Sequence, residues 1–318
     1  SLEQASNVAF LPAYPLAIKA FTLLTGNTWT AGILVSNLAF LAALIVLFKL
    51  TQLKFDRAVA VRAVLYTAAF PSAFFYFGMY GESLYLLAVL LSFYFWEKRR
   101  DWSGGIAGAV AALTRPMGMM LLMSGAAFHL VERGRRVGGG HTAQLIVHGV
   151  RSRLSWSVLS LLFIPLALAG FMAYTYAVFG EPLAFLKSRT VGWAEPVSIL
   201  PTSHVELVAS ILNGGIFRGQ GPALRLLDGA SAVAFLALTG TVFKRLGPSY
   251  GLYSLGSLAM ALVVNLDGLT RYVAVIFPVF MALASWRQRA VVAVPLVTLS
   301  LMLMGLMASM FAKWYFVG

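Results

Sequence analysis

Charged side chains stand at the ends of several long apolar segments, where their types suit a substrate that carries phosphate and hydroxyl groups. Arginine offers a planar fork of N–H donors to phosphate oxygens, and a carboxylate can accept a proton from an attacking hydroxyl. The charged candidates are Glu82, Arg115, Glu195, Asp267 and Arg271. The predicted substrate- and phosphate-binding set is Arg115, Arg271, Glu82, Tyr80, Asp267 and Tyr272. Glu82 is also a candidate catalytic residue.

Each of these residues also has a purely structural explanation. Arg115 could simply pair with Glu82, and Arg271 could anchor an apolar segment at the membrane surface. Glu82 could stabilise the N-terminus of the helix expected after it, because a carboxylate is favourable there. Asp267 precedes a glycine, which is typical of a turn, and Glu195 precedes a proline in a loop. The sequence leaves both explanations open.

Other catalytic chemistries find no support in the sequence. The chain has no cysteine, which excludes disulfides, thiol nucleophiles and thiolate metal ligands. The three glycines at 138–140 are not followed by Lys-Ser or Lys-Thr, so they form no P-loop. The histidines show neither the HxxxH nor the HExxH spacing of zinc sites: His129, His141, His148 and His204. We predict no metal site and no firm cofactor, and leave open whether a divalent metal takes part.

The amino-acid composition is that of a protein embedded in a membrane. Of the 318 residues, 60% are hydrophobic and 11% are charged, whereas soluble domains average about 45–50% and about 25%. A soluble globular enzyme and a disordered chain are therefore excluded. The formal net charge of +13 fits basic loops that orient a membrane protein better than it fits nucleic-acid binding. We expect an all-α polytopic membrane protein whose partners include membrane lipids and no nucleic acid.

Apolar runs bounded by charges, Gly or Pro define the predicted helices. Ten of them cross or half-cross the membrane, over residues 28–50, 58–78, 83–97, 103–114, 117–131, 154–179, 223–243, 250–264, 270–286 and 290–312. Segment 12–25 is too short and too amphipathic to span, and it predicts a helix at the interface. We expect one transmembrane domain over 1–318, made of an outer interfacial segment (1–27), a first bundle (28–179), an outer loop (180–222) and C-terminal helices (223–318).

The basic residues predict the orientation of this bundle. If residues 1–27 lie outside, 16 of the 24 Lys and Arg fall in inner loops, as the positive-inside rule requires. The candidate site then faces away from the cytoplasm. The lack of cysteine and the compact loops favour a bacterial plasma membrane; in a eukaryote, the same protein would belong in the endoplasmic reticulum membrane.

Residues 103–131 predict a hairpin of two short helices. Thr114-Arg115-Pro116 interrupts the run, and the loops on both sides are strongly basic, so both ends should lie inside. Each arm is too short for an apolar layer of about 30 Å. Because polar backbone at membrane depth is tolerated only in protein or beside water, we expect a water-filled cavity that opens outward, with Arg115 at its floor.

Six short strings follow one another along nearly the whole chain: AFLPAYPL at 9–16, VSNLAF at 35–40, FPSAFF at 70–75 with YGESL at 80–84, ALTRPMG at 112–118, FGEPLAF at 179–185, and RY at 271–272 with FP at 277–278. In this order they resemble strings of the PIG-V-like mannosyltransferases, such as AFFPLYPLL, FPTAFF…YTESLF, A-x-TRPxG, FGDPLAF and RYxxxxFP. That family consists of polytopic GT-C glycosyltransferases.

The resemblance implies a GT-C-like bundle and an inverting glycosyltransferase that faces the non-cytoplasmic side. Its donor would be a polyprenyl- or dolichyl-phosphate sugar, usually mannose, and its acceptor a glycan, lipid or protein. Arg115 and Arg271 would bind the lipid phosphate, and Glu82 would orient the sugar or the arginines. The family's catalytic carboxylate lies in a Trp-Asp motif of the first outer loop, which this sequence lacks. We therefore expect a missing N-terminal helix and loop, and the general base stays unassigned.

Two other functions remain open from the sequence. A non-catalytic GT-C-like accessory subunit would share the resemblance and lack the catalytic carboxylate. A lipid or solute transporter would place charges along a path from one side of the membrane to the other, or would have no carboxylate near the arginines.

Overall fold

The computed structural model describes residues 7–132, 156–188, 222–264, 268–286, 290–313 and 315. Within these ranges the regular structure is entirely helical, which confirms the predicted all-α class. The α-helices are α1 (Ala13–Thr25), α2 (Thr28–Gln52), α3 (Arg57–Ala68), α4 (Glu82–Glu97), α5 (Asp101–Thr114), α6 (Met120–Ala127), α9 (Phe163–Phe179), α10 (Ala184–Lys187), α12 (Pro222–Leu246), α13 (Pro248–Val264), α14 (Leu269–Ala274), α15 (Phe277–Ala284) and α16 (Ala290–Ala312).

Shorter helical turns complete the described chain. They are the 3₁₀ segments η1 (Asn7–Ala9), η2 (Ala73–Tyr76), η3 (Pro116–Met119) and η5 (Trp156–Leu162), and the π-helical segment η4 (Phe128–Glu132). Four described helical stretches are long and apolar enough to cross a membrane: Thr28–Gln52, Val158–Phe179, Leu226–Leu246 and Ala293–Ala312. The chain is thus a polytopic, integral membrane protein.

Local sequence signals determine where the first helices begin. Gly26 adopts a left-handed backbone (φ 67°), so α1 ends and the chain turns into α2. The side chain of Asn27 then accepts the backbone N–H of Thr30 at 3.1 Å. Asp56 does the same for Val59 at 2.8 Å at the start of α3. Both residues satisfy N–H groups that a helix start leaves without a partner.

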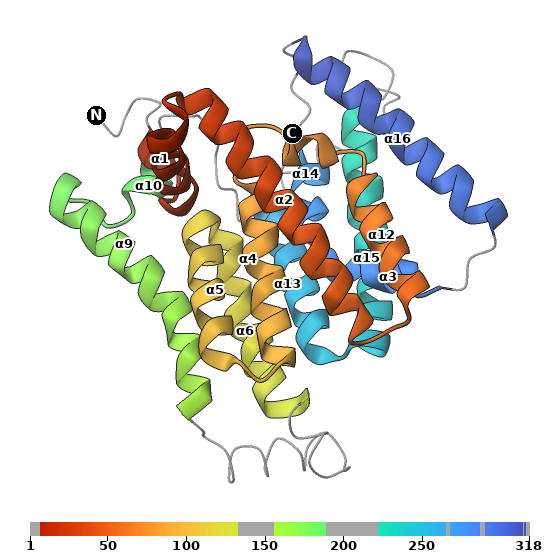
Figure 1. The fold of residues 1–318 in the computed structure, drawn as a ribbon, viewed down its shortest axis with the longest axis horizontal. Helices are drawn as coiled ribbons and strands as arrows, with labels where there is room; N and C mark the ends of the chain where they lie inside the picture. Colours follow the sequence, from red (N-terminus) through yellow and green to blue (C-terminus); the bar gives the residue numbers. More distant parts are fainter. Residues whose placement is uncertain are drawn as a thin grey trace.

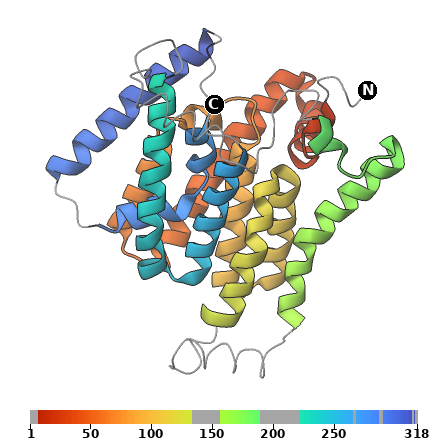
Figure 2. The ribbon, with the colours of Figure 1, turned by 180° about the vertical axis from the view of Figure 1, so that it is seen from behind.

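The helices form a bundle with α4 and α13 near its centre (Figures 1 and 2). α4 packs between α2 and α5, α13 packs on α6 and α12, and α15 packs on α3 and α12. Both views show α9 and α16 leaning away from the bundle on opposite sides. Their exposed surfaces are apolar, as expected for helices that face lipid.

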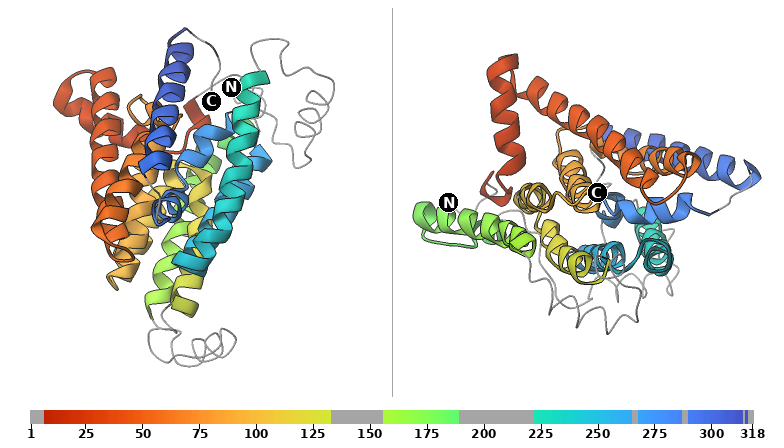
Figure 3. Two further views of the ribbon diagram at one scale, coloured as in Figure 1. Left: turned by 90° about the vertical axis from the view of Figure 1, so that its right-hand side faces the viewer. Right: turned by 60° about the horizontal axis from the view of Figure 1, so that its bottom comes forward.

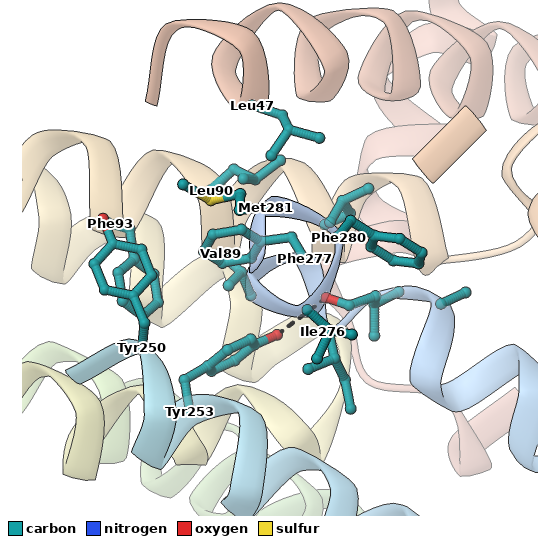
Figure 4. Close-up of a cluster of buried hydrophobic side chains, with 14 of the residues drawn as sticks. Leu47, Val89, Leu90, Phe93, Tyr250, Tyr253, Ile276, Phe277, Phe280 and Met281 are labelled. Atoms are coloured by element: carbon teal, nitrogen blue, oxygen red, sulfur yellow. Dashed lines mark hydrogen bonds between the residues drawn. The ribbon is translucent and has the colours of Figure 1, made fainter. Parts of the chain in front are cut away.

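The core of the bundle is aromatic and fully buried. Phe93 contacts Tyr250, Tyr253 and Phe277 with ring centroids 4.5–5.6 Å apart, and all four side chains are fully buried. The hydroxyl of Tyr253 donates to the carbonyl of Val275 at 3.3 Å, which is the dashed line in Figure 4. Such close-packed rings hold α4, α13 and α15 in fixed relative positions.

Two predicted crossings are interrupted. The run 58–78 is helical only as α3, and the chain then turns through η2 before α4 begins. Pro71 explains the interruption, because proline disfavours helical backbone in the residue before it. The run 270–286 is divided into α14 and α15, and Pro278 lies in the first turn of α15. The prediction of one continuous membrane crossing was therefore wrong for both runs, although each run contains helices.

Tyrosine and serine hydroxyls satisfy the carbonyls around the second interruption. Tyr76 donates to the carbonyl of Ala274 at 2.9 Å, and Ser72 donates to the carbonyl of Thr270 at 2.9 Å. Both donors come from the interrupted segment after α3. The first break thus supports the second, since its hydroxyls donate to carbonyls of α14.

The predicted hairpin at 103–131 is present, but its arms separate. Its turn is at Arg115, and a Cβ on Gly118 would lie 2.4 Å from the backbone nitrogen of Ala112, so the chain doubles back tightly. Below the turn the indole of Trp96 stands between the arms. A Cβ on Gly104 of α5 would lie 2.5 Å from it, and one on Gly125 of α6 would lie 3.0 Å from it.

α1 lies across the end of the bundle rather than along it, as Figures 1 and 3 both show. No residue of α1 is fully buried. This placement supports the expected interfacial helix, whose position relative to a membrane stays a prediction. The N-terminus of α4 and the turn at Arg115 lie at this same end of the bundle (Figure 1).

Candidate functional site

Glu82 is the first residue of α4 and is almost completely buried, with 1% of its surface exposed. The preceding segment brings it there, because Ser83 next to it donates to the carbonyl of Tyr76 at 2.7 Å. A carboxylate at a helix N-terminus is stabilised by the free N–H groups of the first turn. A buried carboxylate nevertheless needs cationic partners, and two arginines supply them.

Arg271 is the first partner. Its Nε–H donates directly to Oε1 of Glu82, across 189 residues of sequence. The guanidinium also lies over two aromatic rings, with its Cζ 4.5 Å from the centroids of Phe75 and Tyr80. Stacking of this kind fixes the plane of the guanidinium.

Arg115 is the second partner. Its Nη1 lies 3.1 Å from Oε1 of Glu82, and its Cζ lies 4.9 Å from the ring centroid of Tyr272. The contact with Glu82 is an ion pair without hydrogen-bond geometry, and Nη1 is buried without an acceptor. A buried donor in this state is costly unless a ligand completes it. Arg115 is therefore the group in the site with a donor available to an anion.

The cluster of Glu82, Arg115 and Arg271 carries two positive charges and one negative charge. Counted over these three described side chains, the sum is one positive charge in a largely buried position. Excess positive charge with forked N–H donors suits a phosphate. The structure brings together five of the predicted site residues: Glu82, Arg115, Arg271, Tyr80 and Tyr272. Asp267 and Glu195 lie outside the described residues, as does His204.

Asp228 of α12 is a residue that the sequence reasoning missed. Its Oδ2 accepts the backbone N–H of Gly268 at 2.9 Å, and its Oδ1 accepts the N–H of Thr270 at 2.7 Å and the Thr270 hydroxyl. It therefore holds the N-terminus of α14 next to Arg271. The sequence did contain a signal for Asp228, which is an acidic residue inside the predicted apolar segment 223–243. Such residues are rare in membrane segments and usually have a partner or a function.

Tyr14 of α1 is a second residue that was missed. Its hydroxyl shares a 2.7 Å hydrogen bond with the hydroxyl of Ser36, which donates to the carbonyl of Tyr80 at 3.2 Å. Burial raises the pKa of Tyr14 to about 12, against a lowering by Ser36, so this phenol stays protonated. Burial also raises the pKa of Tyr80, although Arg271 opposes this. The chain of hydrogen bonds ties α1 to the cluster.

A second buried ion pair lies at the opposite end of the bundle. Lys54 contacts Oε1 of Glu97 at 2.6 Å, and the Tyr250 hydroxyl donates to the same oxygen at 3.2 Å. Glu82 and Glu97 are the first and last residues of α4, and Phe93 of the aromatic core lies between them on this helix. Among the described residues, the two charged groups are therefore not joined by a charged path.

Comparison with known proteins adds one match. Residues 9–147 match the family model of dolichyl-phosphate-mannose-protein mannosyltransferase. No curated protein and no solved structure matches the chain. The chain is thus similar, over a part that includes Glu82 and Arg115, to a family of membrane glycosyltransferases of the GT-C type. The narrower resemblance to PIG-V-like enzymes stays a prediction.

Proposed function

We propose that this chain acts as a membrane glycosyltransferase of the GT-C type. It would take mannose from a polyprenyl- or dolichyl-phosphate donor and transfer it, with inversion, to a glycan, lipid or protein acceptor on the non-cytoplasmic side. The observation that supports this most is the pair of guanidinium groups at Glu82, with a buried donor nitrogen that lacks an acceptor. The family match over residues 9–147 supports the class of donor.

The two arginines would bind the phosphate of the donor. Arg115 would offer its buried Nη1, and Arg271 would add the positive charge of a guanidinium that stacks on two aromatic rings. Phosphate oxygens match this fork, and the site's low exposure strengthens the attraction. Tyr80 and Tyr272 would then serve by fixing the arginines rather than by binding the sugar themselves.

Transfer would proceed by one displacement at the anomeric carbon. The acceptor hydroxyl oxygen attacks from the face opposite the phosphate, the bond between C1 and the phosphate oxygen breaks, and the hydroxyl proton passes to a base. The polyprenyl phosphate leaves with one additional negative charge. Two fixed guanidiniums stabilise that charge more strongly in the transition state than in the donor, which is how such groups accelerate a reaction.

Glu82 would position the arginines rather than serve as the base. A carboxylate that already pairs with two guanidiniums is a weak proton acceptor. Asp228 is also unsuited to this role, because both of its oxygens accept hydrogen bonds from α14. The base is therefore unassigned in the described residues, and a non-catalytic accessory subunit is the alternative. The separation of the two charged ends disfavours a transporter with a charged path.

The test uses the full-length protein in proteoliposomes with polyprenyl-phosphate mannose labelled in the sugar. We expect release or transfer of the label by the wild type and a fall of about 10–100-fold in R115Q, since a hydrogen bond to a charged group contributes about 1.5–3 kcal/mol. K19Q is the control, because Lys19 is an exposed basic residue of α1 at the same end of the bundle. Binding of the donor without turnover by the wild type would favour the accessory subunit; absence of binding would reject both.

A further inference from the structure

Two arginines from different helices meet at the C-terminal end of α15. The Nε–H of Arg62 in α3 donates to the carbonyl of Ala284 at 3.0 Å. The Nη1 of Arg245 in α12 donates to the carbonyl of Ser285 at 2.7 Å and to its hydroxyl oxygen at 3.0 Å. Because the two carbonyls are consecutive, both guanidiniums approach the same end of α15.

The positive charge at this point is not neutralised by the described chain. Among the described residues, neither Arg62 nor Arg245 forms an ion pair with an Asp or Glu. A helix C-terminus contributes only about half a negative charge against two full positive charges. Each guanidinium also has five N–H donors, and the hydrogen bonds to α15 use one nitrogen of each. Charge and donors therefore remain for an anion.

The surroundings identify the anion as part of a lipid. Arg245 lies in the last turn of α12, which ends at the end of the bundle opposite the start of α4 (Figure 1), and Arg62 lies midway along α3. Trp286 follows directly and is 40% exposed, as aromatic residues at a membrane interface are. On α3, Val61 and Leu65 flank Arg62 and are 52% and 45% exposed, so apolar surface adjoins the charge.

We propose that Arg62 and Arg245 together bind the phosphate of an anionic phospholipid, with an acyl chain along the exposed apolar side of α3. Basic groups between membrane helices recognise acidic lipid headgroups in this way. The site goes beyond the proposed function, because it lies at the other end of the bundle and takes no part in sugar transfer. Its effect would be to fix α15, and through α15 the break between α14 and α15, in the presence of acidic lipid.

The test compares two double variants of the full-length protein that lose the same charge from the same two helices. R62Q/R245Q removes the pair, while glutamine keeps an N–H donor for the α15 carbonyls. R57Q/K244Q removes two exposed basic residues of the same two helices, neither of which forms a hydrogen bond with α15 in the described part of the chain. Native mass spectrometry from nanodiscs with equal phosphatidylglycerol and phosphatidylcholine would count the retained lipids.

We expect wild type and R57Q/K244Q to retain phosphatidylglycerol, and R62Q/R245Q to retain at least about fivefold less, as the loss of a headgroup charge contact implies. An equal loss of phosphatidylglycerol in both double variants would mean that general surface charge binds the lipid, and it would overturn the site. Full retention of phosphatidylglycerol by R62Q/R245Q would also overturn it. Glycerol 3-phosphate at millimolar concentration should not displace the lipid; displacement would identify a site for soluble phosphate instead. Arg245 is exposed, so R245Q alone serves the same comparison if the double variant does not fold.

Discussion

Glu82 joins two arginines that come from distant parts of the chain, and this makes it the residue on which the cluster depends. E82Q keeps the size of the side chain but removes the carboxylate that the guanidiniums of both Arg115 and Arg271 contact. Breaking a buried ion pair by removing one partner costs about 3–5 kcal/mol. We expect a loss in the unfolding free energy of this size, measured as a shift of thermal or denaturant unfolding in detergent.

The matched control for E82Q is E181Q. Glu181 follows α9 and accepts a 3.3 Å hydrogen bond from the backbone N–H of Leu183, and it forms no ion pair in the described part. We expect E181Q to change the unfolding free energy by less than about 1 kcal/mol. Equal unfolding midpoints for E82Q and wild type would mean that the cluster does not hold the bundle together.

Asp228 is predicted to position Arg271 through α14. D228N retains one acceptor oxygen but places an amide N–H against backbone N–H groups, so α14 should shift. We expect the unfolding free energy to fall by about 1–3 kcal/mol and the KM for the sugar donor to rise by about tenfold with a smaller change in kcat. Steady-state kinetics in proteoliposomes measures KM and kcat separately.

The control for Asp228 is T239A, which removes a buried hydroxyl from the same helix α12 without touching α14. A purely structural role predicts lower stability for D228N with an unchanged donor KM. That result would remove Asp228 from the site and leave it as a helix cap.

The residues of the charged cluster could be predicted from the sequence, whereas the residues that hold the cluster in place could not. Glu82, Arg115 and Arg271 were found because charge at the end of an apolar segment is visible in a single sequence. Asp228 lies inside an apolar run, and its partners are backbone N–H groups that no spacing reveals. Tyr14 was missed because its role depends on how α1 crosses the bundle, which the amphipathic pattern alone does not determine.

At the scale of helices, the tight turn at Gly118 is the most specific feature of the hairpin. A Cβ at Gly118 would lie 2.4 Å from the backbone of Ala112, whereas a Cβ at Gly170 in α9 would meet nothing within 4 Å. We expect G118A to lower the unfolding free energy by about 1–3 kcal/mol through overpacking. G170A should leave it unchanged or raise it by up to about 1 kcal/mol, because alanine favours helix.

The two glycine variants are compared by thermal unfolding and by donor turnover. G118A should also lower turnover, because the turn carries Arg115, while G170A should not. Similar behaviour of the two variants would show that the turn tolerates a shift and that Arg115 does not depend on it.

The helices themselves could be predicted from the apolar runs, but their interruptions could not. Hydropathy treats 58–78 and 270–286 as continuous, since Phe, Val and Tyr are apolar in either conformation. Pro71 and Pro278 were visible, yet proline is also tolerated within membrane helices. The breaks persist here because Tyr76 and Ser72 satisfy the carbonyls of the other segment, and this pairing is a tertiary contact.

For the whole molecule, the orientation in the membrane decides which side of the membrane the Glu82 cluster faces. The sequence has no cysteine, so single cysteines can be introduced without a background. We expect a cysteine at Lys19 to react with a membrane-impermeant maleimide from the non-cytoplasmic side, and a cysteine at Lys244 to be protected there. Both lysines are exposed and lie on described helices. The reverse labelling would place the cluster on the cytoplasmic side.

The central claim is that Arg115 and Arg271, held by Glu82, bind the phosphate of a lipid-linked sugar. An electron cryo-microscopy structure of the full-length protein in nanodiscs with polyprenyl-phosphate mannose tests this most directly. We expect a phosphate within hydrogen-bond distance of both guanidiniums, with the buried Nη1 of Arg115 among its donors. A donor phosphate bound elsewhere, with the Glu82 cluster unchanged and unliganded, would contradict it.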